Sequence, residues 1–298
     1  MFRAPLRAFE APLEIHSQPL TLGVERGVPQ HTRRNMNEKT DAGQPNMLEI
    51  LERLKGMPGQ RIRDAILELE TPVASILVPN FWELDRHLEW YERGTVAWMP
   101  QSEEHERLIN QYLRETLRLI HNLVAATKTV VDHTRNILRR EWPDESSAVR
   151  TEFEAEKRVF TNDGRLMVMQ GLRNFVLHYK LPAVLANDTW TPETGMVSRI
   201  RISTASLLES KEVWTSEAKH YLRNAGDTIE LRPLAREYVE RALDLQNRAI
   251  KSIETHEAGK LGPWKGLAEQ IASHWREVLS RAGQPAEAPE HRTDSPDT

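Results

Sequence analysis

Hydrophobic residues recur at three- and four-residue steps through most of the chain, which is the period of an amphipathic helix. The longest such segment covers residues 102–141 and ends just before Pro143. Its apolar stripe consists of Ile109, Leu113, Leu117, Ile120, Val124, Thr127 and Val131. The pattern therefore predicts one very long helix near the middle of the chain.

Shorter helices are predicted on the same grounds. They cover residues 47–55, 59–70, 81–93, 145–160, 163–179, 215–224, 232–256 and 264–281. Residues 197–203 differ, because apolar and polar side chains alternate there with the period of a strand, after Gly195. Its partner strand is either 183–190 or 206–214. The predicted fold class is thus all-α, a multi-helix bundle with a small β-hairpin insertion near residues 183–214, after the 163–179 helix.

The two ends of the chain lack sustained periodicity and are poor in apolar residues. We expect residues 1–45 to be a disordered arm and residues 283–298 a disordered tail, with one helical domain over residues 46–282. Met36 and Met47 are alternative starting points for the natural protein.

Composition narrows the possible classes of protein. Of 298 residues, 39% are hydrophobic. The formal net charge is −4, so the chain lacks the overall basic charge that is common in nucleic-acid binders. A local basic groove is compatible with this net charge. The chain has no cysteine, which excludes disulfides and cysteine nucleophiles. The apolar stretches fall well short of the roughly 20 residues that a membrane span needs, and the N-terminus has no apolar signal region. We expect a cytoplasmic protein without a membrane segment.

One short motif stands out, at residues 173–178. Arginine followed by four to six residues and then histidine is expected about three times by chance in this composition. Arg26 to His31 and Arg114 to His121 are two such matches. Requiring asparagine directly after the arginine, and histidine five residues after it, leaves only Arg173, Asn174 and His178.

Helix geometry supports the narrower motif. Asn174 and His178 are four residues apart and share a helix face. Arg173 lies about 140° around the helix from His178, so its side chain has to curl back or reach a site that another helix or subunit completes. Leu181 and Pro182 follow, and proline disfavours the helical state of the residue before it. The motif is thus predicted in the last turn of a helix.

Residues 171–182, GLRNFVLHYKLP, resemble the signature of the HEPN superfamily of all-helical proteins. That resemblance implies RNA cleavage without a metal or other cofactor, in a homodimer whose two motif helices line one cleft. A toxin or defence setting fits this resemblance, but the sequence does not identify a protein antitoxin or regulator. The hairpin after the motif and the C-terminal helices depart from a minimal domain of this kind.

The residue types fit the chemistry that the resemblance implies. His178 could take the 2′-OH proton, Arg173 could stabilise charge on the phosphorane, and Asn174 could orient either the histidine or the phosphate. Lys180, Arg199 and Arg201 are candidate substrate-binding residues, since arginine and lysine contact phosphates. A solvated strand face is the alternative interpretation of Arg199 and Arg201.

Other interpretations stay open from the sequence. The histidines show no spacing typical of metal ligands, so no metal site is predicted. Arg173 could join a surface ion pair, Asn174 could bond locally and His178 could bind a C-terminal carbonyl. The competing function is a non-catalytic interaction or scaffold protein in which the motif supports dimer packing. The RNA-cleaving role needs the Arg173 and His178 side chains to be exposed and to converge on one cleft, within one subunit or across two.

Overall fold

The computed structural model describes residues 47–93, 102–193, 195–210 and 213–282. Its contacts divide the chain into residues 1–52 and residues 53–298. The described part of the first unit is the start of helix α2 (Met47–Lys55). The two predicted disordered ends, 1–45 and 283–298, lie outside the described residues.

The second unit is mainly helical with a small antiparallel sheet, which confirms the predicted fold class. Its elements are, in chain order, α3 (Pro58–Pro72), the π-helical turn η2 (Val73–Leu77), α4 (Val78–Glu92), α5 (Glu103–Glu141), α6 (Ala148–Asn162), α7 (Gly164–His178), β1 (Val184–Thr191), β2 (Gly195–Ser203), α8 (Thr204–Leu208), α9 (Ser216–Asn224), β3 (Thr228–Glu230), α10 (Leu231–His256) and α11 (Ala258–Ala282). None of the helices in the described ranges is long and apolar enough to span a membrane.

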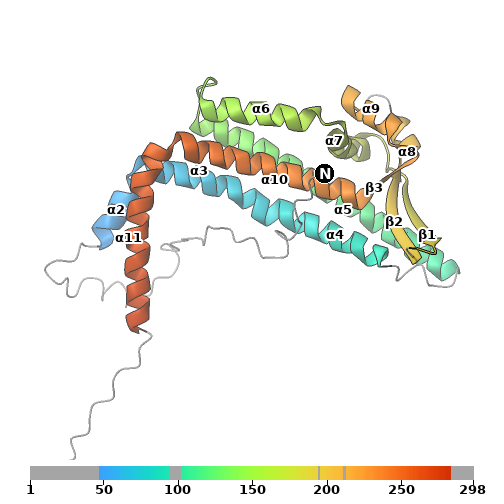
Figure 1. The fold of residues 1–298 in the computed structure, drawn as a ribbon, viewed down its shortest axis with the longest axis horizontal. Coiled ribbons are helices and arrows are strands. Elements are labelled where there is room, and N and C mark those ends of the chain that lie inside the picture. The colour runs from blue at the N-terminus through green and yellow to red at the C-terminus, as the bar shows by residue number, and fades with distance from the viewer. Residues whose placement is uncertain (1–46, 94–101, 194, 211–212, 283–298) are drawn as a thin grey trace, which may run out of the picture. The chain divides into compact units, whose positions relative to one another are not determined.

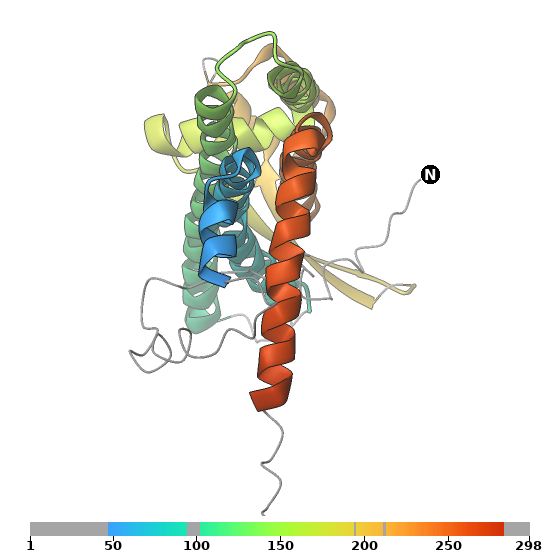
Figure 2. The ribbon, with the colours of Figure 1, turned by 90° about the vertical axis from the view of Figure 1, so that its left-hand side faces the viewer.

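The long helices α3, α4, α5 and α10 run alongside one another, and α6 packs on α10 (Figure 1). Helix α7 crosses them: it is seen almost along its axis in Figure 1 and lies across the long helices in Figure 2. Buried apolar side chains from these helices and from the sheet form one continuous core. The helix that carries the motif is therefore part of the core.

The predicted helices over 59–70 and 81–93 are joined rather than separate. Pro72 has no N–H to donate, and the N–H of Val73 bonds to Glu70 O, one residue short of the usual α-helical partner. The π turn then absorbs the irregularity, with the N–H of Val78 bonding to Val73 O. Pro79 follows at the start of α4, where proline is tolerated. The helix thus continues through both prolines.

A buried side chain completes the backbone bonding at this irregular turn. Gln246 of α10 donates from Nε2 to Leu69 O at 2.8 Å, and its Oε1 accepts from Thr134 Oγ1 of α5 at 2.5 Å. Gln246 is 3% exposed, so leaving its amide unpaired would cost free energy. One polar side chain therefore ties together α3, α5 and α10.

A buried carboxylate joins α4 to α10. Asp85 is 3% exposed and accepts two hydrogen bonds from each of two arginines, Arg232 at 2.9 and 3.0 Å and Arg236 at 2.7 and 2.8 Å. Arg232 also donates from Nη1 to Glu92 Oε2 at 2.6 Å. Burial alone would raise the pKa of Asp85, but the hydrogen bonds and charges of the two guanidinium groups outweigh it and lower that pKa to about 2.

The sheet has the strand order β1-β2-β3, all antiparallel. The first of the two alternatives for the partner strand is correct, because residues 184–191 pair with β2, whereas residues 204–208 are helical. The alternation in β2 buries Ile200 and Ile202 on the inner face. On β1, Asp188 accepts two bonds of 3.1 Å from the hydroxyl of Tyr91 on α4. This contact fastens the hairpin to the helices.

Replacing Asp85 with asparagine is expected to lower the free energy of unfolding by about 3 kcal/mol at neutral pH, because two partly buried guanidinium groups lose their shared carboxylate. Urea unfolding followed by circular dichroism measures this. The matched control is Glu83→Gln, also on α4, whose ion pair with Arg118 at 2.8 Å is half exposed and worth at most about 1 kcal/mol.

Wild type and Asp85→Asn also test how the free energy of unfolding depends on pH. Since the pKa of folded Asp85 lies below its unfolded value, its contribution to stability is complete above about pH 4 and is lost as the pH falls towards 2. Wild type should therefore lose about 2–3 kcal/mol over this interval that Asp85→Asn does not lose. Parallel stability curves for the two proteins would contradict the assignment.

Candidate functional site

Both ends of α7 are fixed by local hydrogen bonds. Asp163 caps the start, accepting from the backbone N–H of Arg165 at 2.9 Å and of Leu166 at 3.2 Å. At the other end, the N–H groups of Tyr179 and Lys180 both bond to Phe175 O. The helix ends at His178, within one residue of the predicted boundary. The motif accordingly occupies the last turns of a well-defined helix.

Most of α7 is inaccessible to solvent. It contacts α5, α6, α9 and α10, and Leu166, Val168, Met169, Leu172 and Phe175 are fully buried. In its second half the side chains that reach solvent are Gln170, Arg173, Asn174, Val176 and His178, among the positions whose burial is described. Gln170, Arg173, Asn174 and His178 together form a solvent-accessible side about 140° wide, with Arg173 at one edge and His178 at the other.

The three predicted catalytic side chains lie on this accessible side. Asn174 and His178 are exposed, and Arg173 is half-buried. Within the described part of the chain, none of the three makes a hydrogen bond or an ion pair through its side chain. The surface ion pair and the local bonds considered as alternatives from the sequence are not formed there. The three polar groups thus remain available to a ligand.

Tight packing holds the motif helix in place. A Cβ atom at Gly171 would lie 2.5 Å from the indole ring of Trp214, far closer than any real contact. The same indole stacks on Phe175 at 5.6 Å between ring centroids, and its Nε1 donates to Leu207 O at 2.7 Å. Trp214 is 4% exposed, so its ring is part of the core. Gly171 therefore sets the depth at which α7 lies.

Counted as part of the helix, Tyr179 falls on one apolar stripe with Val168, Leu172 and Phe175, and the structure differs from this prediction. Its backbone, with φ of −125° and ψ of −77°, has left the helical conformation, and its side chain is 49% exposed. The stripe prediction is wrong here because helical spacing applies only while the helix continues. An exposed aromatic ring consequently lies next to His178.

The predicted substrate-binding cations already have carboxylate partners. Lys180 forms an ion pair with Glu209, and Arg201 Nη2 lies 3.1 Å from Glu230 Oε1. Arg199 Nε is 3.8 Å from the other oxygen of Glu230. A phosphate at these positions would have to compete with glutamates, so Arg173 is the least neutralised of the four cations considered.

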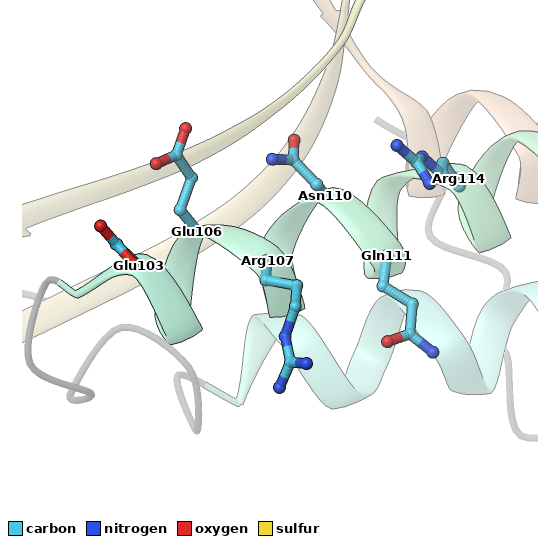
Figure 3. Close-up of a pocket in the computed structure, with 6 residues that line it drawn as sticks. All are labelled: Glu103, Glu106, Arg107, Asn110, Gln111 and Arg114. Carbon is cyan, nitrogen blue, oxygen red and sulfur yellow. The ribbon is translucent and has the colours of Figure 1, made fainter.

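A separate surface pocket lies along the first turns of α5 (Figure 3). Its lining residues are Glu103, Glu106, Arg107, Asn110, Gln111 and Arg114. Two glutamates precede two arginines and two amides along this helix, and none of the predicted site residues is among them. Arg114 is the arginine of the chance match with His121, and it lies far before Arg173 in the sequence.

The described residues contain no group of three or more His, Cys, Asp or Glu side chains that could hold a metal ion. In comparisons with known proteins, no family model matches the chain, and no curated protein or solved structure is significantly similar to it. The resemblance to the HEPN superfamily therefore rests on residues 171–182 and stays a prediction.

Gly171→Ala is expected to destabilise the protein by about 1–3 kcal/mol, because the added methyl group overlaps the indole of Trp214 and one of them must shift. Gly266→Ala on α11 is the matched control. Nothing lies within 4 Å of its added Cβ, and alanine favours a helix by up to about 1 kcal/mol. Thermal unfolding compares the two variants, and equal melting temperatures would contradict the packing argument.

Proposed function

We propose that this chain is a HEPN-like protein that binds and cleaves RNA without a metal, through the motif at the end of α7. The observation that carries the proposal is the accessibility of Arg173, Asn174 and His178. They lie unpaired, within the described residues, on the solvent-facing side of a helix that is otherwise part of the core.

In the proposed reaction His178 accepts the proton of a ribose 2′-OH, and the 2′-oxygen attacks the adjacent phosphorus. The bond from phosphorus to the 5′-oxygen breaks, the leaving oxygen takes a proton from water, and protonated His178 gives its proton to the hydroxide that remains, which restores the neutral imidazole. Arg173 stabilises the charge that develops on the phosphorane, and Asn174 holds the phosphate or the imidazole in position. The products are a 2′,3′-cyclic phosphate and a 5′-hydroxyl.

The angular offset between Arg173 and His178 favours a site shared by two copies of the chain. The two residues lie about 140° apart around the helix, so one helix does not readily direct both at one phosphate. A second copy could place its Arg173 opposite the first copy's His178. We therefore propose a homodimer as the active form.

The competing function, an interaction or scaffold protein, has one observation in its favour. Tyr179 and Leu181, which follow the motif, are 49% and 59% exposed, as expected of side chains that a protein interface would cover. In that case variants of Tyr179 and Leu181 would abolish dimerisation, and no RNA would be cleaved.

Cleavage of single-stranded RNA in the presence of EDTA tests the proposed function. His178→Ala and Arg173→Ala should each lower the rate by about 100-fold or more, since general acid–base catalysis and charge stabilisation of this kind contribute about that much. Wild type should yield 2′,3′-cyclic phosphate ends and leave DNA of the same sequence intact.

His274→Ala on α11 and Arg86→Ala on α4 are the matched controls, because they remove the same side-chain types away from α7. Both should retain wild-type rates. Equal activity in all five preparations would show that the motif is not responsible for cleavage.

A further inference from the structure

An exposed aromatic ring directly follows the motif histidine. Tyr179 is 49% exposed although its neighbour Phe175, four residues earlier, is fully buried. The two rings touch at a centroid distance of 5.2 Å and an angle of 51°. The tyrosine therefore rests on the core at one edge while much of its surface faces solvent.

A second contact limits the motion of this ring. Lys180 Nζ lies 5.8 Å from the ring centroid, within range of a cation–π interaction, and the same ammonium group is paired with Glu209. Two hydrogen bonds from residues 179 and 180 to Phe175 O fix the backbone beneath it. The ring is thus held in advance of any ligand, which reduces the entropy lost on binding.

Two exposed apolar side chains follow the ring in the sequence. Leu181 is 59% exposed, and Leu185 at the start of β1 is 43% exposed. Tyr179, Leu181 and Leu185 thus give three exposed aromatic or apolar side chains within seven residues after His178. The exposed aromatic face of Tyr179, next in sequence to groups suited to phosphate and ribose, matches the composition of a nucleotide.

We propose that Tyr179 stacks against a base of single-stranded RNA bound at the motif. This inference rests on the proposed function and names its substrate class. Bases in a duplex are already stacked on their neighbours, whereas those of single strands and loops can turn onto an aromatic side chain. Tyr179 is then a positioning residue, which holds one nucleotide so that an adjacent phosphate lies against Arg173 and His178.

The test uses a single-stranded oligoribonucleotide that carries 2-aminopurine, whose fluorescence falls when it stacks on an aromatic ring. The full chain carrying His178→Ala binds this probe without cutting it. Adding Tyr179→Ala should abolish the quenching and weaken binding roughly 5- to 150-fold, as the loss of one stacked base predicts. Tyr179→Phe should restore both, because phenylalanine keeps the aromatic face.

Trp190→Ala is the matched control. Trp190 is 62% exposed, and it lies on β1 six residues, or about 20 Å, beyond Val184, the first residue of that strand. It should leave both binding and quenching unchanged. With His178 intact, Tyr179→Ala should raise KM more than it lowers kcat. Double-stranded RNA should bind much more weakly than the single strand.

The outcomes separate the two proposals. Loss of cleavage in His178→Ala together with unchanged quenching and affinity in Tyr179→Ala overturns the stacking proposal alone. Equal effects of Tyr179→Ala and Trp190→Ala, or equal binding of double-stranded RNA, also overturn it. Cleavage that does not depend on His178 rejects the proposed function itself.

Discussion

The two arginines that share Asp85 hold α10 against α4, and much of the remaining structure depends on that junction. Residues 85 and 232 are far apart in sequence, and their ion pair joins α4 to α10. Helix α10 also packs on α6 and α7, so the position of the motif helix is linked to a pair of guanidinium groups elsewhere in the core. Buried charges of this kind favour one arrangement, because a shifted helix would leave a charge without its partner.

Local patterns were sufficient to predict the helices that are long and strongly amphipathic. The prediction of a helix over 102–141 matches Glu103–Glu141 closely, because Ser102 caps its start, accepting from His105 N at 3.2 Å, and Pro143 follows its end. The sequence patterns predict two separate helices on either side of Pro72 and Pro79, whereas the helix continues through both prolines, and the reason is physical. Proline rules consider the nearby chain, whereas the irregular turn is supported by Gln246, more than 170 residues away.

The candidate site was predictable to a similar extent. The position of the motif at a helix end follows from the sequence, but its accessibility depends on which faces of α7 are covered by four other helices. The pairing of Arg199 and Arg201 with Glu230 follows from the register of a third strand only three residues long, which gives almost no periodic signal. The exposed ring of Tyr179 follows from one residue of non-helical backbone, which spacing rules do not detect.

The positions of α7 are either buried or accessible to solvent, and natural selection acts differently on these two groups. A substitution at Gly171, Leu172 or Phe175 alters the packing of the core, so selection there acts through the amount of folded protein. At Gln170, Arg173, Asn174 and His178 the side chains reach solvent, and a substitution can change chemistry while the fold persists. Divergence of activity among descendants of this chain would therefore be concentrated in the solvent-accessible positions of a single helix.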